Sequence, residues 1–435
     1  MMHPITEIIK KRQLDVPLGM ASFCTANDIV IEAILENANR FGDHVLIEST
    51  ANQVNQFGGY ANMTPFEFSE YIYEIAEKVN FPKEKIILGG DHLGPLAWAD
   101  KPEKEAMENA CELVKQAVLA GYTKIHLDTS MMLADDPADV RLSDETIAKR
   151  GAMLYKSCED AFKKRCEKYP DSMHPVYIIG SEVPVPGGIQ NEEDALQVTD
   201  INDFENTINI YKTVFEEFGF DDAFDNIVAI VVQPGVEFGN DEIHIYDRNA
   251  ARTLSEKLKE YPNIVFEGHS TDYQSKSKLK EMVEDGVAIL KVGPALTFAL
   301  REGLFSLALM EKELNLKDKS HFIDVLDNVM LDNPDDWQKY YFGSDLEIKL
   351  ARKYSFSDRC RYYMANEEVM QSIDKLIKNI DSCDVPLGMI KQFFPNAFEK
   401  IRDGKISKDA KSLVKSNIED VVEDYNFAVK YNYKL

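Results

Sequence analysis

The chain has 435 residues, which is too long for one ordinary domain and suits a barrel-sized domain with an extension. Its formal net charge of −26 argues against a nucleic-acid partner or a membrane surface, because both carry negative charge. The six cysteines form no CxxC pair, and no apolar run reaches the ~18 residues needed to cross a bilayer. We therefore expect a cytoplasmic protein of enzyme size.

The chain begins with an amphipathic segment, residues 1–13, that lacks the apolar core of a signal peptide. Short apolar runs rich in β-branched residues follow, separated by helix-length segments with apolar residues at three- and four-residue spacing. Each run is almost continuously apolar, as expected of parallel strands buried on both faces. The eight runs are residues 18–23, 44–49, 85–90, 123–128, 176–181, 226–232, 263–268 and 287–292.

This alternation predicts an α/β fold, a (β/α)8 TIM barrel over residues 1–315. A doubly wound open sheet is the main alternative, but no GxGxxG follows the first run and no GxxxxGK[ST] occurs in the sequence. Residues 316–435 are rich in helix-forming residues and predict a helical C-terminal extension. This extension would cover one end of the barrel or form a subunit interface, as in a homo-oligomer.

Polar and ionisable residues stand at the ends of most runs, where a barrel carries its active site. A single Asp at such a place is more often a helix N-cap than a catalyst. Together, however, these groups would repel or desolvate one another unless a metal ion or a charged substrate held them. The residues at these ends are Glu48, Asp91, His92, Asp128, Glu182, Gln233, Glu267, His269, Ser270, Thr271, Lys291 and Gly293.

Two of these residues, His92 and His269, lie on the third and seventh runs and could face each other across the rim. Two imidazoles with Glu182 or Gln233 would make an open site for a divalent metal ion. Zinc, manganese, nickel, cobalt and magnesium all stay open as its identity. The alternative is that the histidines only hydrogen-bond to substrate.

Two stretches are candidates for binding a phosphate group. The first is the rim after the last two runs, where Ser270, Thr271 and Gly293 precede a helix N-terminus. The second is YSFSDRCRYY, residues 354–363, which places Arg359 and Arg361 among serines and tyrosines in an acidic chain. The alternative for the second stretch is an exposed helix start. Further candidates for substrate contact at the rim are Glu48, Asn52, Gln53 and Lys291.

Long stretches of the sequence resemble one family, the GatZ/KbaZ family, and occur in its order over nearly the whole chain. The family is named for the non-catalytic subunit of tagatose-1,6-bisphosphate aldolase, and the resemblance implies a TIM barrel similar to that of class II aldolases. The stretches are IESTANQVNQFGGY, GGDHLGP, EVPVPGG, VVQPGVEF, HSTDYQ, KVGPALTFALRE and YSFSDRCRYY.

The resemblance implies two different functions. Some members are subunits that stabilise and activate a separate catalytic class II aldolase. Others act alone on a phosphorylated ketose, as D-tagatose 6-phosphate or D-fructose 6-phosphate 4-epimerases. Some were once labelled tagatose-6-phosphate kinases, but the sequence has no nucleotide-phosphate loop. We favour the epimerase, with the aldolase subunit as the alternative.

Similarity to class II aldolases also implies roles for single residues. Asp91 and His92 match an Asp-His pair in which the Asp is an acid/base and the His a zinc ligand. His269 matches a histidine of the seventh strand, and Glu182 an acidic residue of the fifth. Class II aldolases have a ligand histidine on the sixth strand, where this chain has Gln233, a weaker ligand. For an epimerase that cleaves and reforms C3–C4, the groups that could take the C4 hydroxyl proton are Asp91, Asp128 and Glu182.

Overall fold

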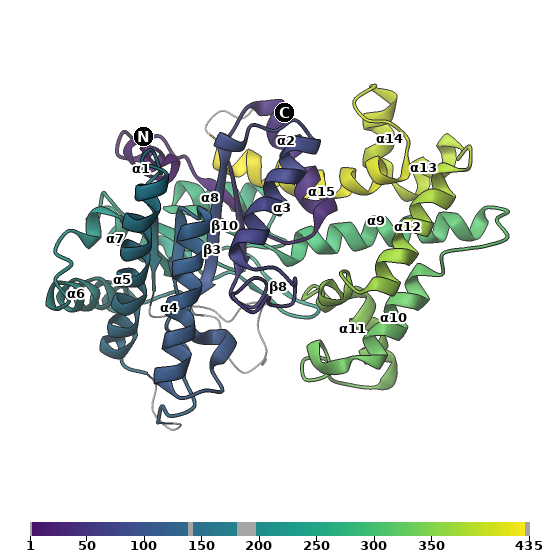
Figure 1. The fold of residues 1–435 in the computed structure, drawn as a ribbon. Helices are drawn as coiled ribbons and strands as arrows, with labels where there is room; N and C mark the ends of the chain where they lie inside the picture. Colours follow the sequence, from purple (N-terminus) through teal and green to yellow (C-terminus); the bar gives the residue numbers. More distant parts are fainter. Residues whose placement is uncertain (1, 138–141, 181–196, 431–435) are drawn as a thin grey trace.

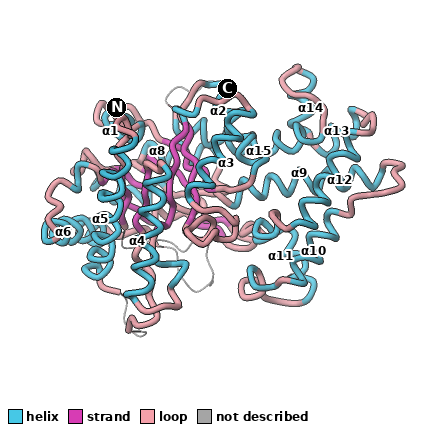
Figure 2. Tube along the Cα trace, in the orientation of Figure 1, coloured by secondary structure: helices cyan, strands magenta, loops and turns pink. Residues whose placement is uncertain are grey.

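The computed structural model describes residues 2–137, 142–180 and 197–430. Eight parallel strands close into a barrel, in which the first strand pairs with both the second and the last (Figure 1, Figure 2). The prediction of a TIM barrel is confirmed, and every predicted run overlaps one strand of it. The strands are β1 (Met20–Cys24), β2 (Val45–Thr50), β3 (Ile86–Leu93), β4 (Lys124–Leu127), β5 (Val176–Ile179), β6 (Ile227–Val232), β9 (Val265–Gly268) and β10 (Val287–Val292).

Helices between the strands cover the outside of the barrel, so that both faces of the sheet are buried. None of the described helices is long and apolar enough to cross a membrane. A short hairpin of β7 (Glu237–Phe238) and β8 (Ile243–His244) follows β6. The outer helices are α2 (Asp28–Phe41), α3 (Pro65–Lys78), α4 (Glu103–Ala120), α5 (Asp144–Lys168), α6 (Ile201–Glu217), α7 (Arg248–Leu258), α8 (Lys276–Glu284) and α9 (Pro294–Glu313).

The predicted N-terminal helix, α1 (Pro4–Arg12), closes the amino end of the barrel. Its buried residues Ile5 and Ile9 belong to an apolar cluster with the first residues of several strands, including Met20 and Val176. His3 caps the helix, because its Nδ1 accepts a hydrogen bond from the amide of Ile5 at 3.2 Å. The barrel is therefore apolar inside at this end, and its polar interior lies at the carboxyl end.

The extension is helical, as predicted, and α9 leads into it from the barrel (Figure 1). The last helix returns to the barrel, where it packs against α2, α8 and α9 and also contacts β1. The extension is thus packed on the outside of the barrel as well as on α9. The boundary at residue 315 stays a prediction. The helices of the extension are α10 (Phe322–Asp332), α11 (Asp345–Tyr354), α12 (Glu367–Asp381), α13 (Leu387–Phe393), α14 (Pro395–Arg402) and α15 (Ala410–Val429).

Candidate functional site

A β-bulge in β3 turns two successive side chains into the barrel. The sequence suggests that Asp91 and His92 follow the strand, but β3 continues through both residues to Leu93. The register of β3 against β4 shifts between Gly90 and Leu93, and His92 has a φ of 46°. Regular strands alternate their side chains between faces, whereas a bulge re-aims one of them. Both residues are consequently buried at the same site.

Below this bulge, the barrel interior holds a layer of ion pairs instead of apolar side chains. The ammonium of Lys124 on β4 lies 2.7 Å from Oε1 of Glu48 on β2 and 2.7 Å from Oε2 of Glu267 on β9. Lys291 on β10 contacts Oε2 of Glu48 and lies 2.6 Å from Oδ1 of Asp91. These charges form one connected network that reaches the bulge.

Gly89 makes room for this layer. A Cβ at this position would lie 2.5 Å from Oε1 of Glu48 and 2.8 Å from its Cγ. Such distances are shorter than van der Waals contact, so a larger residue on β3 would displace the Glu48 carboxylate. Gly89, two residues before Asp91, is thus required by the close approach of the Glu48 side chain.

Three imidazoles form a triangle directly above the ion-pair layer. The ring centroids of His92, His126 and His269 are 4.7 to 5.2 Å apart. Together with Asp91 they offer ligand atoms that all lie within 4.8 Å of one another. Strands β3, β4 and β9 therefore bring together a set of donors typical of zinc and related divalent ions.

Two of the three imidazoles are oriented by carboxylates. Nδ1 of His92 donates to Asp128 at 2.7 Å, and Nε2 of His269 donates to Glu267 at 3.0 Å. Such pairs are typical of metal-binding histidines, because the second nitrogen is left free with a fixed direction. Nε2 of His126 is buried and has no hydrogen-bond partner within the described residues. The other nitrogen of His126, Nδ1, accepts from the amide of His92 at 3.2 Å and lies 3.3 Å from Oδ1 of Asp91, so this nitrogen is the one in contact with the cluster.

The electrostatics also suit a bound cation. Burial alone would raise the pKa of Asp91, but His92 and Lys291 hold it well below its usual range. Burial lowers the pKa of His269 to about 3, so this imidazole is neutral at physiological pH. Asp91 is thus an ionised carboxylate and His269 a neutral imidazole, and these are the forms that bind metal ions. Burial alone would lower the pKa of His92, but Asp91 and Asp128 raise it, so His92 would have to release a proton to bind an ion. The residues present therefore fit a divalent ion.

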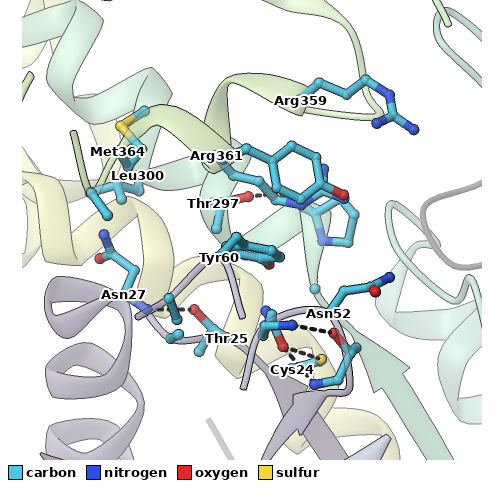
Figure 3. A pocket seen from close by; sticks show the side chains of 18 of the residues that line it. Cys24, Thr25, Asn27, Asn52, Tyr60, Thr297, Leu300, Arg359, Arg361 and Met364 are labelled. Atoms are coloured by element: carbon cyan, nitrogen blue, oxygen red, sulfur yellow. Dashed lines mark hydrogen bonds between the residues drawn. The ribbon is translucent and has the colours of Figure 1, made fainter. Parts of the chain in front are cut away.

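The cluster opens into a cavity of about 940 Å³ between the barrel and the extension. Figure 3 shows Cys24, Asn52 and Tyr60 from the barrel, and Arg359 and Arg361 from the extension, around this cavity. Three of the cluster residues line it, together with Lys291; the lining residues of the cluster are Asp91, His92 and His269. The extension is consequently part of the wall of the site.

The two arginines of the extension enter the cavity wall without acidic partners. They belong to a short 3-10 helix, η5 (Arg359–Tyr363), and not to the exposed helix start that is the alternative from the sequence. Arg359 stacks on the ring of Tyr340, and Arg361 donates to the hydroxyl of Tyr362 at 2.9 Å. Among the described residues, neither guanidinium has a carboxylate within ion-pair distance; Arg359 donates to the backbone carbonyl of Asp336, and Arg361 to those of Ser357 and Asp358. Their charges stay available to an anion.

Of the other predicted rim residues, four line the cavity and Thr271 does not. Asn52, Gln53, Ser270 and Gly293 line the cavity. In contrast, the hydroxyl of Thr271 donates to the carbonyl of Lys291 at 2.5 Å and is buried.

A helix N-terminus at Gly293 is also a predicted phosphate site, but its amides already have an acceptor. The carboxylate of Asp272 accepts from the amides of Gly293 at 3.0 Å and Ala295 at 2.8 Å. An anion at this turn would have to compete with a fixed carboxylate. Among the two predicted phosphate stretches, the arginines of the extension are therefore the better placed.

Two further predicted residues, Asp128 and Gln233, do not line the cavity. Asp128 is engaged by His92 and by the hydroxyl of Ser130 at 2.7 Å. The side-chain oxygen of Gln233 accepts from the amides of two following residues, at 2.8 and 2.9 Å, which occupies the atom that would bind a metal ion. Glu182 lies outside the described residues.

The sequence interpretation missed His126, Lys124 and the role of Glu267. A usable signal exists, because residues two apart on a strand point to the same side. Lys124 and His126 precede Asp128 at this spacing, and Glu267 precedes His269. Charged residues within a barrel strand, in phase with a candidate site residue, indicate a polar layer beneath the site.

The fold and the site together are those of a TIM-barrel protein with a buried acid and histidine cluster at the carboxyl ends of its strands. The chain belongs to the family described as D-tagatose-1,6-bisphosphate aldolase subunit GatZ/KbaZ-like, whose model matches residues 5–430. The resemblance seen in the sequence is thereby confirmed.

Individual relatives match over almost their whole length. The D-tagatose-1,6-bisphosphate aldolase subunits GatZ of Salmonella dublin and Salmonella enteritidis are each 44% identical to this chain, over 97% of it and 98% of their own length. A crystal structure of a probable tagatose 6 phosphate kinase from Sinorhizobium meliloti 1021 matches with a TM-score of 0.86 at 42% identity. That match covers 95% of this chain and all of the other.

Proposed function

We propose that this chain is an accessory subunit of a class II D-tagatose-1,6-bisphosphate aldolase, which stabilises and activates a separate catalytic subunit. The observation that supports this is the match of residues 5–430 to a family described as that subunit. Relatives named as the same subunit align from end to end. The epimerase favoured from the sequence becomes the second candidate.

Co-expression with a class II tagatose-bisphosphate aldolase tests the proposal. We expect the two chains to elute together from a sizing column, and the aldolase to lose activity more slowly on heating when this chain is present. A matched control is bovine serum albumin at equal mass, which tests for nonspecific protection. Separate elution with an unchanged rate of inactivation would refute the accessory role.

The second candidate, a 4-epimerase of D-tagatose 6-phosphate and D-fructose 6-phosphate, is favoured by one specific observation. The cavity combines a cluster suited to a metal ion with two arginines that have no acidic partner. A ketose phosphate needs a cation at its C2 carbonyl, an acid/base near C4 and a cationic group for its phosphate. All three lie around one cavity.

The residues of this chain would divide the reaction as follows. A divalent ion held by His92, His126 and His269 would supply positive charge at the C2 carbonyl. Asp91 lines the cavity, unlike Asp128, and would accept the C4 hydroxyl proton as the C3–C4 bond breaks. The aldehyde fragment would rotate, and Asp91 would return the proton as the bond reforms on the other face.

The purified chain alone separates the two candidates. Incubation with fructose 6-phosphate and zinc, manganese, nickel, cobalt or magnesium, followed by NMR, would reveal tagatose 6-phosphate if the chain is an epimerase. Metal content is measured at the same time in the wild type and in His92→Ala, and we expect it to fall in the variant. Equal and negligible metal in both proteins would remove the ion from either function.

A further inference from the structure

Lys124 is a fully buried cation that touches neither the cavity nor solvent. Its ammonium lies between carboxylates of two other strands, 2.7 Å from Oε1 of Glu48 on β2 and 2.7 Å from Oε2 of Glu267 on β9. All three side chains have no exposed surface. Barrel interiors are normally filled by apolar side chains, and burying charges is costly. The position therefore calls for an explanation beyond packing.

The other oxygen of each carboxylate accepts a hydrogen bond from a residue of the site. Oε2 of Glu48 accepts from the ammonium of Lys291 and from the hydroxyl of Ser22. Oε1 of Glu267 accepts from Nε2 of His269 at 3.0 Å. Each carboxylate thus has one oxygen within ion-pair distance of Lys124, without the geometry of a hydrogen bond, and the other on a side chain that lines the cavity.

We propose that Lys124 is a positioning residue, which fixes His269 and Lys291 by holding Glu267 and Glu48. A carboxylate that orients a metal-binding histidine must itself be held, or the imidazole loses its direction. Lys124 is a single group that anchors two such carboxylates from β2 and β9 at once. The inference rests on the proposed metal site, and its test reads metal affinity directly.

The first experiment is a calorimetric titration of the full-length protein with zinc ion. We expect Lys124→Met to bind zinc about 10 to 100 times more weakly than the wild type, as is usual when an outer partner of a ligand is lost. Arg150→Met is the matched control, because Arg150 is also buried and paired with two carboxylates, Glu103 and Asp136. Neither carboxylate lines the cavity, and this control should keep wild-type affinity.

A charge-balanced variant separates positioning from simple charge neutralisation. Lys124→Met with Glu48→Gln removes one positive and one negative charge and leaves Glu267 in place to face His269. We expect resistance to urea to recover in this double variant while zinc binding stays weak. The double variant also tests the proposal if Lys124→Met alone does not fold.

Wild-type zinc affinity in the double variant would overturn the proposal, because Lys124 would then only neutralise charge. Equal affinity in Lys124→Met and the wild type would overturn it as well, while leaving the metal site intact. Failure of the wild type to bind zinc would refute the metal site itself. These results are distinguishable, because the last is seen without any variant.

Discussion

The extension is joined to the barrel by a buried ion pair, and this pair gives a quantitative prediction. Nε of Arg301 on α9 donates to Oδ1 of Asp358 at 2.8 Å, and the hydroxyl of Thr297 donates to Oδ2 at 2.7 Å. Both charged residues are 2% exposed. Asp358 directly precedes η5 and has a φ of 45°. It therefore fixes the start of the segment that carries both arginines of the cavity.

Replacing Asp358 by Asn keeps its size but leaves the guanidinium of Arg301 buried without its counter-charge. Breaking a buried pair in this way costs about 3–5 kcal/mol of unfolding free energy. With an unfolding entropy of about 2.1 cal/mol/K per residue, such a loss shifts the Tm of a chain of this size by only about 3–5 °C. Urea unfolding is the better measurement, because it reads the free energy more directly.

A double-mutant cycle of Asp358→Asn and Arg301→Met tests the assignment. We expect the two changes to couple by more than about 1 kcal/mol, because each removes the partner of the other. Lys149→Met and Glu145→Gln form a control cycle on an exposed pair, where coupling of no more than about 0.5 kcal/mol is expected. Coupling within about 0.5 kcal/mol for the buried pair would refute the reasoning, since independent sites behave in that way.

Three further predictions concern the site and the N-terminal helix. If the chain has the second candidate function, Asp91→Asn should lower turnover by about a hundred- to ten-thousand-fold, measured as epimerisation of fructose 6-phosphate; turnover near the wild-type rate would pass the role to another acid. For the same candidate function, Arg361→Ala and Arg359→Ala should each raise KM for fructose 6-phosphate by roughly one to two decades, and unchanged KM in both would make the stretch structural. Burial lowers the pKa of His3 to about 3, below the unfolded value of about 6.5, so its contribution to stability is complete above pH 6.5 and is lost as the pH falls towards 3. His3→Asn replaces the capping ring nitrogen by a side-chain oxygen that does not titrate in this range, and urea unfolding should show a smaller loss of stability for the variant; equal losses in the variant and the wild type would refute this role of His3.

The strands of the barrel could be predicted because each is a short apolar run between amphipathic helices. Burial on both faces removes the alternation of polar residues, and the sequence then shows a strand directly. The bulge in β3, in contrast, could not be predicted from this apolar pattern. A shift of register depends on how β3 pairs with β4, and no local pattern around Asp91 and His92 reveals such a shift.

The wall of the cavity could be predicted only in part, because it joins segments far apart in the chain. The residue type of Arg361 and its Ser- and Tyr-rich surroundings are enough to make it a candidate for phosphate binding. Its position at the barrel mouth depends on Asp358 meeting Arg301, 57 residues earlier on α9. The packing of α15 against the barrel also could not be predicted, because the sequence of an amphipathic helix does not indicate which surface its apolar side covers.

The ion-pair layer has a bearing on both candidate functions. A barrel that served only to stabilise a partner would have no physical need for a lysine and two glutamates in its interior, because apolar residues of similar volume are often as stable or more stable there. Glu48, Lys124 and Glu267 instead lie directly beneath the imidazoles and reach them through His269. Buried charges in such contact are typical of sites that bind an ion or a charged ligand. We therefore expect the cavity to bind a ligand whether the chain acts alone or beside an aldolase.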